Sequence, residues 1–377
     1  MSVTRARRSS ITNSIKRNDA AAGNLMYPWF AAWGDMLGSN PVIESFNTSG
    51  QGFAMDKVAA IQTEKGDIQI AMSNSGPPVS GSYNGGRTFA SFPNLNYGTL
   101  VGAFNGSFIG GGNYISSAAA YSSDIAVNGW TYVGASAGNF NAGAGGWIHQ
   151  NLPLWAIPLT NGGIHYIRWI VGPAGSYGVP AGGTWTDSAI VTAGGSGSNS
   201  KVAVIGSPTT YGGYGTLYYA GYSNSTPSTG TFFMRAAAFS SSGTFITANT
   251  VTPPAITGLM QSFVSLGETL ILSTVDNKLY TSTDGGGTWV TRTSPFSGTS
   301  ALAISTSVSG RVIASSANTG ISPKYYQSAD GATWTEFANF SPPINSASYG
   351  VPVTDNGFVY LTIANGNLGI RLRGFAG

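Results

Sequence analysis

An eight-residue motif recurs along the chain and constrains its fold more than any other feature. Its clearest copy, STDGGGTW, occupies residues 282–289. Residues 82–89 (SYNGGRTF) keep the same register with Asn in place of Asp, and residues 328–334 (SADGATW) are one residue shorter. Weaker echoes lie between these copies. The closing aromatic residues occupy positions 89, 130, 185, 245, 289 and 334, so the steps between copies are 41, 55, 60, 44 and 45 residues.

The segments between the copies have the pattern of short β-strands. From residue 40 onward, short apolar or alternating runs such as 68–72, 164–171 and 270–272 are separated by Gly, Asn, Ser and Asp. Many short strands with glycine-rich turns are typical of a β-sandwich, a β-barrel or a β-propeller. A period of 40 to 60 residues with about four strands in each favours the propeller, in which small twisted sheets stack around an axis. The fold class predicted for residues 39–377 is therefore all-β, a β-propeller.

The tail of the chain suggests how such a ring would close. After Trp334 there are strand-like runs at residues 349–351, 358–363 and 368–372, but no fourth run. Residues 42–46 (VIESF), near the other end, supply a fourth strand. Pairing of the two ends would close the ring and cover an exposed strand edge. Added to the six marked repeats, this predicts seven blades, with six or eight as the alternatives.

The pattern Ser-x-Asp-x-Gly-x-Thr-Trp at residues 282–289 resembles the Asp-box (BNR) repeat of sialidase-like β-propellers. The match is strong there, good at 82–89 and 328–334, and faint elsewhere, so it covers the repeats from about residue 40 onward. In that family the repeat lies in the hairpin between the third and fourth strands of a blade, on the face away from the catalytic site. The resemblance therefore implies structural turns built from Asn84, Gly85, Gly86, Phe89, Asp284, Gly285, Gly286, Trp289, Asp330, Gly331 and Trp334.

The chemistry of the motif agrees with a structural role. A short carboxylate that opens a tight turn accepts hydrogen bonds from the N–H groups of that turn, and the amide oxygen of Asn84 can do the same. Gly285 and Gly286 allow the positive φ angles that such a hairpin needs. Trp289 would point inward from the next strand and fill the gap between adjacent blades. We therefore interpret the motif as scaffolding.

Composition supports a folded body with an unusual surface. Charged residues make up 8% of the 377 residues, whereas 42% are hydrophobic and 12% aromatic, so a core can form. Surfaces rich in Gly, Ser, Thr and Asn are common in extracellular β-proteins and in virion proteins. The chain has no cysteine, which excludes disulfides and thiolate metal sites and suits folding in a reducing cytosol.

Charge is concentrated in an N-terminal arm, residues 1–38. Residues 1–26 carry five basic groups and one acid, a net +4, so the remaining residues sum to −1 of the total +3. A weak helix is expected over residues 9–26, and an amphipathic turn between Pro28 and Gly38. The aromatic residues of the arm either pack beneath the main domain or dock on another protein. The predicted assembly contact comprises Arg5, Arg7, Arg8, Lys16, Arg17, Trp29, Phe30 and Trp33.

The arm does not match a targeting or nucleic-acid-binding segment. No apolar stretch follows its basic residues, so we expect no secretory signal, and no run approaches the roughly 20 residues that span a bilayer. Nucleic acid is disfavoured as a partner because aromatic residues do not interleave with the cations and the body has no basic face. A solvated tail is the simpler alternative to a docking segment.

A search for catalytic chemistry finds little. Sialidases place an arginine in an Arg-Ile-Pro motif, and the similar string here, at residues 156–158 (AIP), lacks the arginine. The eleven acids of residues 27–377 outside the motif turns occur singly, whereas a glycosidase needs two carboxylates about 5–10 Å apart. Only His149 and His165 could add imidazole ligands to a metal site. No catalytic residue, metal site or cofactor is predicted.

These features favour a non-enzymatic structural protein of a bacteriophage particle, in its tail or a fibre. The arm would dock to a neighbouring tail or adaptor subunit, the chain would be homo-oligomeric within the virion, and the propeller would serve as a structural or receptor-facing module. Tyrosines within residues 211–222 could stack on host-surface glycans, although strand packing is favoured for Tyr218 and Tyr219. The alternatives are a surface propeller that binds or hydrolyses glycans, and an assembly factor similar to the Asp-box propellers that help build photosystems.

Overall fold

The structure is a computed structural model, and it consists of β-strands with one short 3₁₀ helix among the residues it describes. The described residues are 42–47, 57–62, 68–73, 79–82, 90–92, 98–112, 118–122, 131–135, 145–149, 151–161, 164–192, 201–205, 216–223, 227–297, 302–306, 312–316, 324–339, 353–355, 358–362 and 368–373. The arm, residues 1–38, and its expected helix therefore lie outside the described residues. Within the described part of the chain, no helix is long and apolar enough to cross a membrane.

The described strands form seven four-stranded antiparallel sheets. Listed from the first strand to the fourth, they are β2 (Lys57–Gln62), β3 (Ile68–Ser73), β4 (Val79–Ser82) and β5 (Ala90–Phe92); β6 (Gly98–Phe104), β7 (Ser107–Gly112), β8 (Ala118–Ser122) and β9 (Thr131–Ala135); β10 (Gly145–His149), β11 (Leu152–Asn161), β12 (Ile164–Val171) and β13 (Thr186–Thr192); β14 (Lys201–Ile205), β15 (Thr216–Tyr222), β16 (Phe232–Phe239) and β17 (Phe245–Val251); β18 (Met260–Leu266), β19 (Thr269–Thr274), β20 (Leu279–Ser282) and β21 (Val290–Arg292); β22 (Leu302–Thr306), β23 (Val312–Ser316), β24 (Lys324–Ser328) and β25 (Thr335–Asn339); and β26 (Val353–Asp355), β27 (Phe358–Thr362), β28 (Leu368–Arg373) and β1 (Val42–Asn47). The 3₁₀ helix, Pro227–Thr229, lies between β15 and β16.

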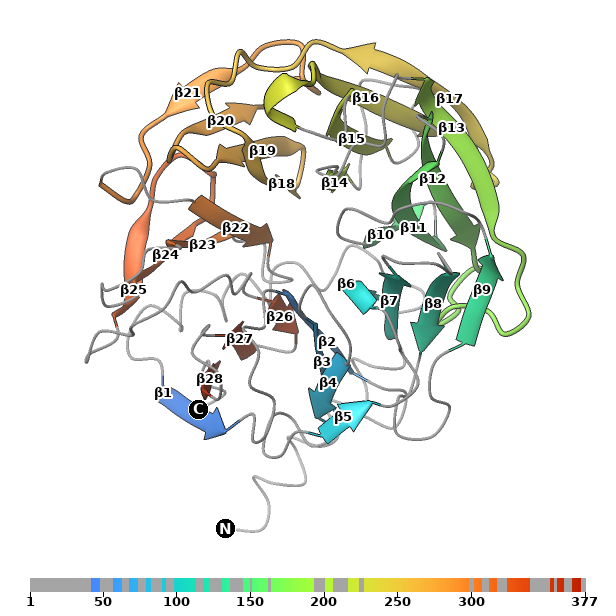
Figure 1. Ribbon diagram of the computed structural model, residues 1–377, viewed down its shortest axis with the longest axis horizontal. Coiled ribbons are helices and arrows are strands. Elements are labelled where there is room, and N and C mark those ends of the chain that lie inside the picture. Colours follow the sequence, from blue (N-terminus) through green and yellow to red (C-terminus); the bar gives the residue numbers. More distant parts are fainter. Residues whose placement is uncertain are drawn as a thin grey trace.

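The sheets are arranged in a ring, with their first strands towards the centre and their fourth strands at the rim (Figure 1). The first strands contact one another in a closed circle, in the order β2, β6, β10, β14, β18, β22 and β26, which returns to β2. Each sheet therefore lies between two neighbours. This position is needed because a small sheet with two apolar faces cannot bury both of them alone.

The last sheet is built from both ends of the chain. Its order is β1-β28-β27-β26, so β1 is the outer strand although it comes first in sequence. β1 runs antiparallel to β28, with Val42 opposite Arg373 and Asn47 opposite Leu368. The backbone groups along one edge of β28 are thereby paired with β1, which removes an edge that could otherwise pair with another chain.

The core lies in the gaps between sheets, and strand alternation supplies both of its sides. In β15, Tyr218 belongs to the cluster shared with the β18–β21 sheet, whereas Tyr219 belongs to the cluster shared with the β10–β13 sheet. In β19, Leu270 and Leu272 face the first of these clusters, while Ile271 faces the β22–β25 sheet. Successive side chains of a strand point to opposite faces, so each buried strand contributes to two gaps.

Polar tips of buried aromatic residues link neighbouring sheets. Trp155 of β11 donates its indole N–H to the carbonyl of Phe104, 3.0 Å away in β6. Tyr222 of β15 accepts the backbone N–H of Met260 at 2.7 Å, in β18. These bonds let large side chains fill the gaps without leaving a buried polar atom unsatisfied.

The repeated motif falls at the same place in six of the seven described sheets. The six copies lie between β4 and β5, β8 and β9, β12 and β13, β16 and β17, β20 and β21, and β24 and β25, which are the third and fourth strands in each case. In the remaining sheet the third strand is β28 and the fourth is β1, so no hairpin joins them. This arrangement explains why the tail of the chain carries no seventh copy.

The idea that tyrosines in residues 211–222 stack on sugars is wrong for the part of this stretch that the structure describes. All seven residues of β15, Thr216–Tyr222, are buried. Tyr218 and Tyr219 are in strand packing, and Tyr222 is only 3% exposed. Tyr211 and Tyr214 lie outside the described residues.

Closure by β1 can be tested by two truncations. Removal of residues 1–38 keeps β1 and should leave the melting temperature nearly unchanged. Removal of residues 1–47 strips the partner from β28 and should lower the melting temperature by several degrees and cause concentration-dependent association. Thermal unfolding and size-exclusion chromatography measure both effects. Equal melting temperatures for the two truncations would contradict the closing role of β1.

Candidate functional site

The turn at residues 282–288 is closed by the carboxylate of Asp284. Its Oδ1 accepts the Thr288 N–H at 2.9 Å and the Ser282 hydroxyl at 2.7 Å, and its Oδ2 accepts the Thr288 hydroxyl at 2.7 Å. The Ser282 Oγ in turn accepts the Gly286 N–H at 2.8 Å. One acid and two hydroxyl groups therefore satisfy the backbone donors of a hairpin that has no room for regular pairing.

The two glycines of this turn are required by its geometry. Gly285 and Gly286 have φ angles of 70° and 88°, in the left-handed region that favours glycine. A Cβ on Gly286 would lie 2.4 Å from Val251 Cγ1 of the preceding sheet, so the turn also packs closely against its neighbour. Trp289 packs on the cluster between these two sheets and donates its indole N–H to the Thr252 carbonyl at 3.0 Å.

The shorter copy at residues 328–334 repeats this design. Asp330 Oδ1 accepts the N–H groups of Ala332 and Thr333, at 2.8 and 2.7 Å, and the Ser328 hydroxyl at 2.8 Å. Gly331 has a φ angle of 72°, and a Cβ there would lie 2.5 Å from Ile271 Cδ1 of the preceding sheet. Trp334 packs on the cluster that contains Ile271.

Both turn carboxylates are held in the ionised form. The pKa of Asp284 is lowered to about 2, chiefly by the bond from the Thr288 N–H and then by the Thr288 hydroxyl. Burial acts to raise the pKa of Asp330, but the N–H groups of Thr333 and Ala332 outweigh it together with the Ser328 hydroxyl, and the pKa falls to about 2. Such groups carry no proton to donate near neutral pH, so neither can be a general acid there.

The fainter copy at residues 240–245 builds its turn from hydroxyl groups. Ser240 Oγ accepts the Thr244 N–H at 3.1 Å, and the Ser240 and Ser242 hydroxyls lie 2.8 Å apart. Gly243, with a φ angle of 76°, donates its N–H to the Ser240 carbonyl at 2.9 Å. A hairpin of this class can therefore form without a carboxylate.

The copy that ends at Trp185 departs from the pattern, because its loop reaches the neighbouring sheet. Residues 172–185 extend to the β6–β7 turn, where Gly178 N–H donates to the Asn105 carbonyl and the Asn105 side chain donates to the Ser176 carbonyl, both at 2.8 Å. The ring of Tyr177 occupies the space where a Cβ of Gly106 would lie. This loop links two adjacent sheets, a contact that the sequence analysis did not anticipate.

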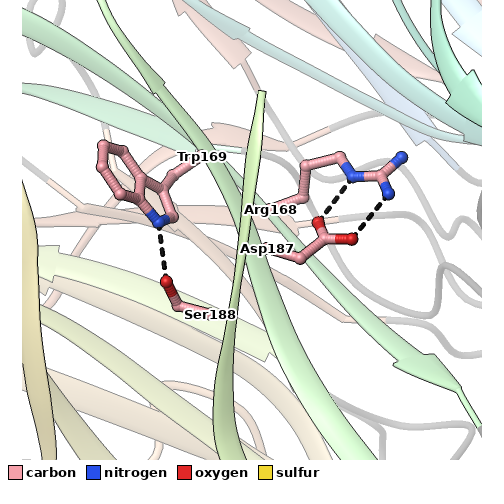
Figure 2. A network of polar contacts seen from close by, with 4 residues as sticks. All are labelled: Arg168, Trp169, Asp187 and Ser188. Carbon is pink, nitrogen blue, oxygen red and sulfur yellow. Dashed lines mark hydrogen bonds and ion pairs between the residues drawn. The ribbon is translucent and has the colours of Figure 1, made fainter. Parts of the chain in front are cut away.

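A second contact missed from the sequence is an ion pair between Arg168 of β12 and Asp187 of β13. The guanidinium makes two bonds of 2.7 Å to the carboxylate (Figure 2). Next to it, the Trp169 indole donates to the Ser188 hydroxyl at 2.9 Å. Arg168 lies directly opposite Asp187 across the two strands, whereas Trp169 and Ser188 are diagonal neighbours. Arg168 is only 6% exposed, and a two-pronged bond to a carboxylate suits such burial.

The three arginines whose side chains the structure describes do not assemble around one substrate position. Arg168 belongs to the β10–β13 sheet and bonds Asp187, whereas Arg292 belongs to the β18–β21 sheet and donates to the Thr281 hydroxyl at 2.8 Å. Arg235, in the sheet between them, lies over the ring of Phe233. Within the described part of the chain, no group of three or more His, Cys, Asp or Glu residues could hold a metal ion.

Several of the residues singled out from the sequence lie outside the described part of the chain. They are Asn84, Gly85, Gly86 and Phe89 of the first copy of the motif and Arg5, Arg7, Arg8, Lys16, Arg17, Trp29, Phe30 and Trp33 of the arm. Of the predicted turn residues, the structure describes Asp284, Gly285, Gly286, Trp289, Asp330, Gly331 and Trp334.

Comparison with known proteins yields a likeness of fold. No family model and no curated protein matches the chain. Among solved structures, YCF48 bound to D1 peptide has a TM-score of 0.54 and 11% identity, and covers 89% of this chain and 98% of its own. BBS1N in complex with ARL6DN has the same TM-score and identity, and the match covers 88% of this chain and 97% of the BBS1N chain. Both neighbours are β-propeller proteins.

The fold is a β-propeller. The ring of four-stranded sheets and its likeness to two propellers over nearly the whole chain agree on this. At 11% identity the likeness extends to the fold alone.

The role of Asp284 can be measured by substitution. Asp284→Ala removes the acceptor for the Thr288 N–H and should lower the free energy of unfolding by about 1–3 kcal/mol. Asp284→Asn keeps one acceptor oxygen, so it should lower the free energy of unfolding by less. Denaturant unfolding gives both values, with Thr283→Ala, at an exposed neighbouring position, as the control. A loss of any ligand affinity by Asp284→Ala without a loss of stability would show that the turn is a binding site.

The lowered pKa values of the two turn carboxylates predict how the stability of the protein changes in acid. The pKa values of Asp284 and Asp330 are lower in the folded state than the ordinary 3.8, so their stabilisation is complete above that value and is lost as the pH falls towards about 2. Unfolding free energies measured from pH 5 to pH 2 should therefore fall, and should fall less steeply in the Asp284→Asn variant. An identical slope in the variant would show that Asp284 does not contribute.

Proposed function

We propose that the chain is a non-enzymatic structural component of a bacteriophage particle, in its tail or a fibre. In this proposal its body is a seven-bladed propeller with Asp-box turns, and residues 1–38 dock to a neighbouring virion protein. The observation that carries the proposal is the separation of charge: residues 1–26 have a net charge of +4, whereas the other residues sum to −1. A cationic arm on a nearly neutral body suits attachment to a partner by the arm.

The point at which the arm joins the ring supports a docking role for the arm and a structural role for the body. The arm leads within a few residues into β1, the outermost strand of its sheet, at the rim of the ring (Figure 1). An arm that starts at the rim can reach a neighbouring subunit while the centre of the ring stays uncovered. The partners would be other virion proteins, including further copies of this chain, and a host-surface glycan would be a second class of ligand.

The chemistry of the described body favours a scaffold over a glycan-cleaving enzyme. Asp284 and Asp330 are committed to their turns with pKa values of about 2, and Asp187 is bound by Arg168. A retaining or inverting glycosidase needs one carboxylic acid whose pKa is raised beside a second carboxylate. Glycan binding or hydrolysis by a sialidase-like propeller remains the alternative that the sequence motif suggests.

The two neighbours in the fold comparison are both described in complex with another polypeptide, a D1 peptide and ARL6DN. A propeller can thus serve as a platform for protein contacts, and this supports a docking role by analogy of fold.

The proposal is tested by removing the arm. A chain without residues 1–26 should fold, stay soluble and keep the melting temperature of the full chain, but fail to join virions that lack the native copy. Arginines of the arm would form charge-assisted bonds to the partner, and Trp29, Phe30 and Trp33 would supply apolar burial. Immunodetection in purified virions measures incorporation.

A charge-reversed variant, with Arg5, Arg7 and Arg8 replaced by Glu, is the matched control for length. It should lose incorporation as the truncation does, because it keeps the length of the arm but not its sign. Normal incorporation of both variants would show that the propeller, and not the arm, carries assembly. Absence of the full chain from purified virions would reject the virion assignment itself.

A further inference from the structure

The two histidines of the chain lie in the same gap between sheets, because His149 bonds to Ser240 and His165 lies against Tyr219 and Phe233 of the β14–β17 sheet. His149 ends β10 and His165 is in β12, and both side chains are 0% exposed. Each reaches across to β15 or β16 of the neighbouring sheet. Apart from the terminal amino group, the two imidazoles are the only groups of this cysteine-free sequence whose ordinary pKa lies between 5 and 8.

His165 is surrounded by aromatic rings. Its Nδ1 lies 2.7 Å from the Tyr219 hydroxyl, and its ring centroid lies 5.7 Å from that of Tyr219 and 4.9 Å from that of Phe233. The guanidinium of Arg235 lies 5.6 Å from the centre of the same Phe233 ring. The described titratable and charged groups around this cluster of rings are the Tyr219 phenol and the Arg235 guanidinium, and the imidazole also bonds to the backbone of Tyr222.

His149 bonds to the hairpin of the neighbouring sheet. Its Nε2 is within hydrogen-bond distance of the Ser240 carbonyl, which can only accept, so this nitrogen is the donor. The same carbonyl accepts the Gly243 N–H at 2.9 Å and closes the hydroxyl-built turn of β16 and β17. The Phe239 ring lies across from the imidazole, 6.4 Å between centroids. Neither Phe239 nor the Ser240 carbonyl titrates.

We infer that the gap between the β10–β13 and β14–β17 sheets is an acid-sensitive interface, at which the ring opens first as the pH falls. Both imidazoles are buried among aromatic rings at the junction of two sheets, where an imidazolium would be poorly solvated. Local separation of the two sheets admits water to both rings at once. Protonation therefore favours the open interface over the closed one.

The direction and range of the effect follow from the pKa values. Burial lowers the pKa of His149 below 6.5 and that of His165 to about 4. A base whose pKa is lower in the closed state than in water destabilises that state as the pH falls, here from about 6.5 down to about 4. The turn carboxylates act in a separate range, between 3.8 and about 2, so the two effects can be distinguished.

Hydrogen exchange of the full-length protein tests the inference. Exchange of β11, β12, β15 and β16 amides, corrected for the intrinsic pH dependence, should be compared at pH 8 and pH 5. His165 alone should raise the opening equilibrium of these strands by roughly thirty-fold at pH 5. Strands β19 and β20, in the next sheet, should change little. Equal changes in all strands, or no change in the gap strands, would overturn the inference.

A variant separates the histidines from other acid effects. His165→Gln places a polar side chain that does not titrate in the gap, so the difference between pH 8 and pH 5 should shrink several-fold in β12 and β15. Asp284→Asn should leave that difference unchanged, because its carboxylate titrates near 2. A His165→Gln protein with the full wild-type response would also overturn the inference. If the variant does not fold, the wild-type comparison between gap strands and β19–β20 decides alone.

Discussion

The burial of both faces of a sheet, seen where the structure describes the side chains, is the constraint on which this molecule depends. Neighbouring residues of one strand, such as Tyr218 and Tyr219, belong to clusters on opposite sides of their sheet. A sheet with two apolar faces needs a neighbour on each side, and a row of such sheets has two exposed ends unless it closes into a ring. The contacts of the first strands from β2 through β26 and back to β2 meet this requirement at the centre. At the rim, the pairing of β1 with β28 completes the last sheet.

The low charge of the chain follows from how the sheets are joined. Several of the described contacts between sheets are hydrogen bonds between neutral groups. The Trp155 indole donates to the Phe104 carbonyl, the Met260 N–H donates to the Tyr222 hydroxyl, and the Trp289 indole donates to the Thr252 carbonyl. A neutral hydrogen bond costs little to bury when it is satisfied, whereas an ion pair must overcome the desolvation of two charges. Aromatic residues can therefore supply both volume and polarity to the gaps, and the protein folds with 8% charged residues.

The repeat could be recognised from the sequence because it is local. The hydrogen bonds of Asp284 connect residues within four positions of it, so the Ser, Asp, Gly and Thr that make the turn are all visible in one short string. The spacing between copies of that string predicts a propeller. The strand-like runs in the tail of the chain predict that its two ends pair. The propeller fold is supported by the solved neighbours.

The features that sequence reasoning missed all join residues far apart in the chain. Arg168 and Asp187 meet because β12 and β13 align in one register, which depends on the loop between them. That loop is long enough to reach Asn105 of the neighbouring sheet, and no short sequence motif indicates that it packs there. The sequence presents the two histidines only as possible metal ligands, and nothing in it indicates that they share a gap between sheets. The two histidines share a gap because the stacking of two sheets places His165 opposite Tyr219.

The closing sheet connects the architecture to the proposed function. Its third and fourth strands come from opposite ends of the chain, so β1 is held along one edge by β28 and leads back into the arm along the backbone. This pairing is the most distant in sequence among the described strands, and such contacts form late because a large loop must close first. In the proposed assembly, a partner that binds the arm only when β1 is in place would stabilise the closed ring by mass action. Docking and ring closure would then be two effects of the same strand, and the particle would select propellers that have closed.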